Sequence, residues 1–75
     1  MDLETHYAIA HKLEAGKSAG WLSEYLVSWH GPSGHLLPAV TVWREPDRSE
    51  PKVRAYLTRL LANLVAQDKI DIAGV

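Results

Sequence analysis

The sequence predicts a small α/β domain of the α+β type, with three helices and a short sheet around residues 36–43. Two observations predict this class. The β-branched run Val40–Val42 has the composition of a strand, and a proline-marked turn leads from it into an amphipathic helix that begins near Pro51. Residues 1–75 are expected to form one domain, whose long C-terminal helix packs on the sheet.

The N-terminal segment, Asp2–Ala15, is predicted to be a helix. Leu3 and Tyr7 begin an apolar stripe with helical spacing. The carboxylate of Asp2 lies near the positive N-terminal end of this helix, where negative charge is stabilising. Gly16 is the predicted end, because glycine is common just after the last residue of a helix.

The pattern of residues 18–30 fits two structures, and a helix fits better than a strand. A helix would gather four apolar side chains on one face, with spacings of i, i+3, i+4 and i+7: Leu22, Tyr25, Leu26 and Trp29. A strand would instead place the polar Ser23 on the same face as Trp21 and Val27. A second helix is therefore predicted from Ser23 onward, and Gly31–Gly34 breaks the chain after it.

Residues 35–43 are predicted to contain one or two strands. Pro38 has no amide donor and is expected at the start of a strand or at a sheet edge. An exposed strand edge near residues 39–43, with Trp43 at its end, is expected to pair with a second copy of the chain.

A third helix is predicted over Ser49–Gln67. Ser49 is a good N-cap residue, and Pro51 in the first turn needs no amide partner. An apolar stripe follows and is expected to supply most of the core: Val53, Tyr56, Leu57, Leu60, Leu61 and Leu64. The tail, residues 68–75, is either a short edge strand or a loose end.

Composition excludes several classes of site and partner. The chain has no cysteine, which rules out disulfides and thiolate metal sites. In residues 44–59 basic residues outnumber acidic ones by only two, so no nucleic-acid partner is expected. No apolar run approaches the roughly 20 residues of a membrane span, and we expect a cytoplasmic protein. Since a core of this size seldom supplies more than about 3–5 kcal/mol, we also expect a homodimer.

Residue types that carry catalysis or bind metal form no recognisable motif. His6 and His11 lie about 140° apart around a helix, so they cannot share a metal ion. His30 and His35 flank a turn without an obvious third ligand, and Ser18 has no Gly-x-Ser-x-Gly context. We therefore expect no metal, no cofactor and no enzymatic activity.

From Ala15 onward the chain resembles the C-terminal part of the effector-binding domain of LysR-type transcriptional regulators. The resemblance covers about two thirds of the chain and is carried by four segments: Ala15–Val27, Gly34–Pro38, Val42–Pro46 and Pro51–Leu57. It implies a strand and a helix after the Ala-Gly turn, and a ligand site near Gly16–Gly20. The chain lacks that family's winged helix–turn–helix, so DNA binding and family-like effector sensing do not follow from the resemblance.

The function predicted from these observations is that of a non-enzymatic binding or regulatory module, a stand-alone remnant of a LysR-like sensing domain. Its partner is a small-molecule effector or a protein, and its expected binding residues are Trp21, Gly16, Ser18, Gly20 and Tyr25. The alternative is a small protein-interaction factor of the mobile-element or phage type that acts on a larger protein. A helix–turn–helix DNA binder over residues 6–29 is more distant, because its second helix has no Arg, Lys, Asn or Gln.

Overall fold

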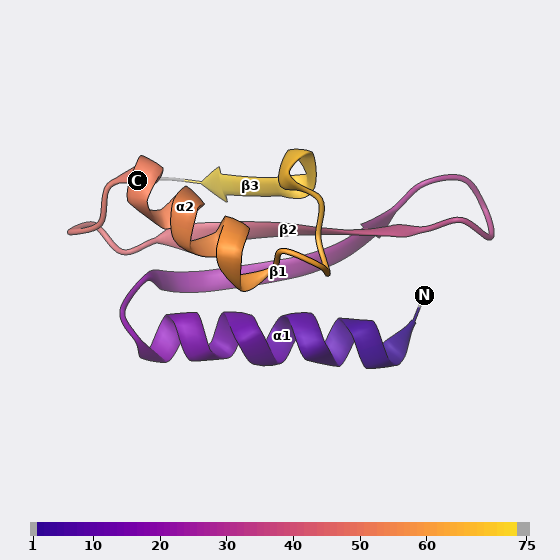
Figure 1. Ribbon diagram of the computed structural model, residues 1–75, viewed down its shortest axis with the longest axis horizontal. Helices are drawn as coiled ribbons and strands as arrows, with labels where there is room; N and C mark the ends of the chain where they lie inside the picture. Colours follow the sequence, from indigo (N-terminus) through magenta and orange to yellow (C-terminus); the bar gives the residue numbers. More distant parts are fainter. Residues whose placement is uncertain (1, 74–75) are drawn as a thin grey trace.

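The computed structural model describes residues 2–73, which form two helices and a three-stranded sheet (Figure 1). The elements follow in the order α1 (Leu3–Ser18), β1 (Leu22–His30), β2 (Leu37–Arg44), α2 (Glu50–Leu60), a 3-10 turn (Gln67–Lys69) and β3 (Ile70–Ala73). The sheet order is β1-β2-β3. The β1–β2 pair is an antiparallel hairpin, whereas β3 pairs with β2 in parallel, and α2 lies in the crossover between them.

Helix α1 confirms the helix predicted at the N-terminus and extends it by three residues. Asp2 is its N-cap, and its carboxylate accepts hydrogen bonds from Glu4 N at 3.1 Å and Thr5 Oγ1 at 2.6 Å. Gly16 does not end the helix as predicted, because it lies within α1 and is buried.

The helix predicted from Ser23 onward is wrong, since this segment is strand β1. A β-bulge between Leu22 and Glu24 resets the alternation of side chains, so Leu22 and Tyr25 both face the helices although they are three residues apart. This spacing imitates a helix. The bulge also turns the Ser23 side chain away from the apolar face. Its exposed hydroxyl donates to Trp43 O at 3.1 Å.

The long C-terminal helix is also wrong, because α2 ends at Leu60 rather than near Gln67. The apolar stripe continues past this point, but Leu61 and Val65 reach the core from turns. The chain must turn here so that β3 can return beside β2 in parallel, a crossover that a longer helix would prevent. The structure of residues 2–73 therefore contains two α-helices instead of the predicted three.

The strand edge expected near residues 39–43 does not exist, because β2 is the central strand. Val40–Trp43 pair with β1 on one side and with β3 on the other. Of the two structures left open for the tail, the short edge strand is present as Ile70–Ala73. Residues 74 and 75 lie outside the described part of the chain.

The core lies between one face of the sheet and the two helices. In Figure 1, α2 crosses in front of the sheet and α1 runs beside β1. The buried side chains come from every helix and strand and from the turn after α2: Ile9, Leu13, Leu22, Val40, Val42, Val53, Leu57, Leu61, Val65, Ile70 and Ile72. Among residues 2–73 no helix covers the opposite face of the sheet, where Leu26 and Trp43 are exposed.

Candidate ligand cleft between the two helices

A cleft of about 370 Å³ lies between α1 and α2 and combines two cations with an apolar base. It is lined by Lys12 from α1 and by Tyr56, Arg59 and Leu60 from α2. Tyr56 and Leu60 are four residues apart, so both lie on the same face of α2 and form the base of the cleft. Within residues 2–73 neither Lys12 nor Arg59 forms an ion pair.

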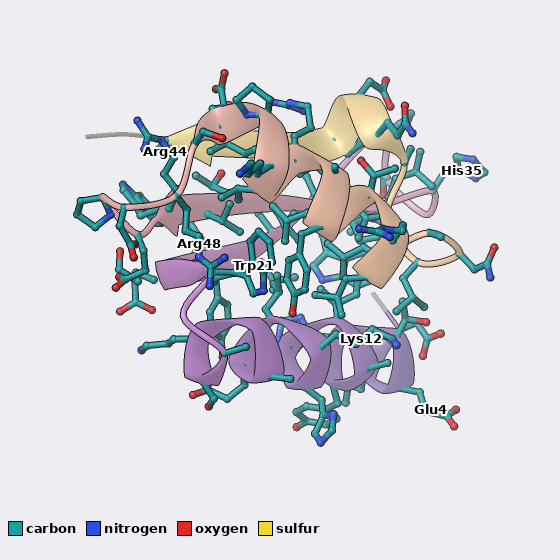
Figure 2. The ribbon with its side chains drawn as sticks, turned by 60° about the vertical axis from the view of Figure 1, so that its left-hand side comes forward. Glu4, Lys12, Trp21, His35, Arg44 and Arg48 are labelled. Atoms are coloured by element: carbon teal, nitrogen blue, oxygen red, sulfur yellow. The ribbon has the colours of Figure 1, made fainter. Side chains whose placement is uncertain are left out.

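The aromatic part of the base of the cleft is fixed by a stack of three side chains. The Tyr56 and Trp21 rings lie parallel, with 4.5 Å between their centroids and 5° between their planes. The guanidinium of Arg48 covers the other face of the indole at 4.1 Å from its centroid. Figure 2 shows Arg48 against Trp21, between α2 and α1. The stack holds the Tyr56 ring in one orientation beside the cleft.

Arg48 is itself held by hydrogen bonds to the loop before β1 and to the end of β2. Its Nε donates to Gly20 O at 3.2 Å, and its own carbonyl oxygen accepts from a guanidinium nitrogen of Arg44 at 2.6 Å. The backbone N–H of Glu45 donates to Trp21 O at 3.4 Å. The loop after β2 is therefore fastened to the loop before β1.

Gly16 allows α2 to approach α1 closely. A Cβ at this position would lie 3.0 Å from a methyl carbon of Leu22 and 3.1–3.2 Å from the ring edge and hydroxyl of Tyr56. These distances are shorter than ordinary carbon contacts, so a larger residue would push the Tyr56 ring away from α1. The glycine thus has a packing role in setting the width of the cleft.

Three of the five predicted site residues meet around this cleft, and two do not. Gly16 touches Tyr56, Trp21 stacks on it, and Gly20 binds Arg48. Ser18 is exposed at the C-terminal end of α1. Tyr25 faces α1 further along β1, where its hydroxyl donates to Glu14 Oε2 at 2.6 Å. Both faces of the Trp21 indole are covered, so this ring supports the cleft instead of presenting a free face to it.

Sequence reasoning missed the four residues that line the cleft. Tyr56 and Leu60 were assigned to the core because they belong to the apolar stripe of α2, yet both are only half-buried. Lys12 and Arg59 lie at exposed positions of two helices far apart in the sequence. Only the way that the helices pack brings these two side chains to one cleft.

A second hollow, of about 400 Å³, lies at the other end of α1 and is less suited to a ligand. It is lined by Asp2, Trp29, Gly34, His35 and Leu36. The charged group among them, the Asp2 carboxylate, already caps α1, and its hydrogen bond with Thr5 lowers its pKa. Within residues 2–73 no group of three or more His, Asp or Glu side chains is placed to hold a metal ion.

No protein-family model, curated protein or solved structure matches this chain. The resemblance to LysR-type effector-binding domains therefore remains a prediction without support from these comparisons. In the part of the chain that the structure describes, neither helix is long and apolar enough to cross a membrane.

Proposed function

We propose that this chain is a non-enzymatic binding module whose ligand is a small organic anion with an aromatic or apolar body. The main support for this proposal is that Lys12 and Arg59 line the same cleft, whose base is formed by Tyr56 and Leu60. A carboxylate would accept hydrogen bonds from the ammonium and guanidinium groups, since neither has an ion-pair partner within residues 2–73. The body of the ligand would lie against the Tyr56 ring and the Leu60 side chain.

The size and support of the cleft favour a small molecule over a large partner. A volume of about 370 Å³ is near the lower end of the range for small-molecule sites. The Arg48–Trp21–Tyr56 stack fixes the aromatic base before a ligand arrives, which lowers the entropy cost of binding. Regulation by such an effector, in a cytoplasmic protein, is the biological role that we propose for this binding.

A second candidate function is docking to a larger protein through the uncovered face of the sheet. Leu26 is 56% exposed and Trp43 is 39% exposed on this face. Tryptophan and exposed apolar side chains are typical of protein interfaces. This candidate predicts a protein partner that is insensitive to changes at Lys12 and Arg59.

The test of the ligand cleft is an NMR titration with phenylacetate and indole-3-acetate, with the corresponding neutral amides as controls. The amide signals of Lys12, Tyr56, Arg59 and Leu60 should shift with the carboxylates and remain unchanged with the amides. Because exposed ion pairs each contribute about 0.2–1 kcal/mol, a Lys12→Ala/Arg59→Ala double variant should bind about two- to thirtyfold more weakly.

The matched control is Lys69→Ala, which removes one positive charge at a residue outside the cleft lining. Its affinity for the carboxylates should equal that of the unmodified protein. Equal weakening in Lys69→Ala and in the cleft variants would show non-specific attraction of anions. Equal shifts with carboxylates and amides, or no shift with either, would contradict the proposal.

A further inference from the structure

The two edges of the sheet differ in how their backbone groups are satisfied. Strand β3 is four residues long, and the carbonyl of Ile70 accepts a hydrogen bond from Arg54 of α2 at 3.3 Å. Strand β1 is nine residues long and forms the other edge. Short, covered edges resist pairing with further strands, whereas long edges with free backbone groups favour it. Strand β1 is therefore the edge at which the sheet can be extended.

Alternate residues of β1 direct their backbone groups away from the sheet. Ser28 pairs with Ala39, and its hydroxyl donates to Ala39 O at 3.4 Å, so this carbonyl of β2 points toward β1. By alternation, the backbone groups of Tyr25, Val27 and Trp29 point outward. Among the backbone hydrogen bonds found within residues 2–73 outside the helices and the strand ladders, none involves these three residues.

The charged side chains along this edge are mostly acidic. Glu24 accepts a hydrogen bond from the backbone N–H of Tyr25 at 3.1 Å, and the same oxygen lies 3.8 Å from Lys17 Nζ. Glu14 Oε2 accepts from the Tyr25 hydroxyl at 2.6 Å. Asp2 lines the hollow at the other end of α1. These three carboxylates outnumber the single ammonium group among them, which favours a basic partner.

Helix α1 places an apolar flank beside the free edge. It runs along β1 (Figure 1), and the face that carries Glu14 is turned toward this strand. Leu3 and Tyr7 precede Glu14 at helical spacing and lie on the same face, where they are 56% and 66% exposed. The Tyr7 ring also packs edge-on against His6, whose Nδ1 accepts from Trp29 Nε1 at 3.3 Å. An exposed apolar surface therefore adjoins the outward backbone groups.

The position of α1 decides what can occupy this edge. A second copy that paired through its own β1 about a two-fold axis would bring the two α1 helices within one strand spacing of each other, about 5 Å. Packed helices need about 8–10 Å between their axes. The homodimer expected from the small core therefore does not use this edge. A single extended peptide carries no helix of its own, so it fits beside β1 with α1 over one of its faces.

We propose that the edge of β1 binds an extended, basic segment of a partner protein, which adds a fourth strand to the sheet. The backbone of this segment forms hydrogen bonds with the outward groups of residues 25, 27 and 29. Its apolar side chains, at alternate positions, contact Leu3 and Tyr7, and its basic side chains face the carboxylates along the edge. The ligand cleft lies on the α2 side of α1 and is separate from this site.

Amide hydrogen exchange followed by NMR tests the edge in the free protein. The amides of Val27 and Trp29 should exchange at least about tenfold faster than those of Leu26 and Ser28, whose backbone groups point toward β2. The reverse order would overturn the proposal. Protection of Val27 and Trp29 that increases with protein concentration would show a second copy on this edge and would overturn it as well.

The probe for the partner segment is the peptide Lys-Thr-Val-Thr-Val-Thr-Lys with blocked ends. It should bind with a dissociation constant below about 1 mM and protect the amides of residues 25, 27 and 29 from exchange. A version with glutamate in place of both lysines should bind at least about fivefold more weakly. Of two analogues N-methylated on the even or on the odd residues, only one should lose binding, because only one set of amides faces β1.

A Leu3→Ser/Tyr7→Ser double variant tests the flank of α1 and should bind the lysine peptide at least about fivefold more weakly. The matched control is Leu37→Ser, since Leu37 is 49% exposed on β2 and should leave the affinity unchanged. Circular dichroism checks that both variants are folded. The proposal fails if millimolar lysine peptide protects none of these amides, if the glutamate peptide binds equally well, if both N-methylated analogues bind, or if the double variant keeps its affinity.

Discussion

The two faces of the three-stranded sheet have different roles. The face toward the helices carries Val40 and Val42 from β2 and Ile70 and Ile72 from β3, all of them buried. On the opposite face Leu26 retains more than half of its exposure. Strand alternation produces this separation, because neighbouring residues of each strand point to opposite faces.

The difference indicates where this small protein can change without losing its fold. Burial on the helix face supplies the apolar contribution to stability, at roughly 25 cal/mol for each Å² removed from water. The open face contributes little to that burial, so substitutions there should have small effects on stability. The cleft between α1 and α2 lies on the helix side, so changes at Lys12 and Arg59 should leave the open face unaltered.

The largest expected effect is the loss of stability on cutting back a side chain of the helix face. Leu57→Ala should lower the free energy of unfolding by about 2–5 kcal/mol, because the Leu57 side chain of α2 is completely buried. The matched variant Leu26→Ala, on the open face, should change it by less than about 1 kcal/mol. Urea denaturation of both variants measures the difference, and similar midpoints would contradict the division into two faces.

Local signals in the sequence predict single elements of the fold, but the predicted three-helix architecture is wrong, and the identity of β1 could not be predicted. Asp2 as a helix N-cap and Val40–Val42 as strand residues are local signals, and both agree with the structure. Strand β1 contains a bulge at Leu22–Glu24, and no residue type in this segment predicts a bulge. Its pairing with β2 overrides the helical spacing of the apolar side chains.

The position at which α2 ends could not be predicted from the sequence either. Leu61 and Leu64 continue the apolar stripe, and neither glycine nor proline marks the end of the helix at Leu60. The parallel crossover to β3 sets this boundary, and it is a property of the whole fold. The cleft was missed for the same reason, since Lys12 and Arg59 meet only when both helices are docked.

An intermediate effect is expected at two tryptophans, Trp21 in the loop before β1 and Trp43 in β2. Trp21→Ala removes the centre of the Arg48–Trp21–Tyr56 stack and should cost about 1–3 kcal/mol, less than a fully buried tryptophan. Trp43→Ala, on the open face, should cost less than Trp21→Ala. Thermal unfolding followed by circular dichroism compares them, and a larger loss for Trp43→Ala would show that the open face contributes to the core.

The smallest expected effect concerns a polar contact of the helix face, the hydrogen bond from Tyr25 to Glu14. This bond stabilises the neutral phenol and, with burial and the charges of Glu14 and Glu24, raises the pKa of Tyr25 above its ordinary value of 10.0. Because the phenol is harder to ionise in the folded protein, it stabilises the fold at pH values below the pKa that Tyr25 has in the unfolded chain. That contribution is lost as the pH rises through the raised folded pKa.

Tyr25→Phe should therefore lower the free energy of unfolding at neutral pH by at most about 1 kcal/mol, since the bond is exposed. The difference between the two proteins should disappear at alkaline pH, once the phenol is ionised even in the folded state. Tyr7→Phe is the matched control, because Tyr7 is 66% exposed on α1 and should show no such difference at any pH. Urea midpoints measured from neutral pH to above the folded pKa decide the matter. A Tyr25→Phe difference that persists unchanged at the alkaline end would mean that the ring, and not the hydroxyl bridge to α1, carries the contribution.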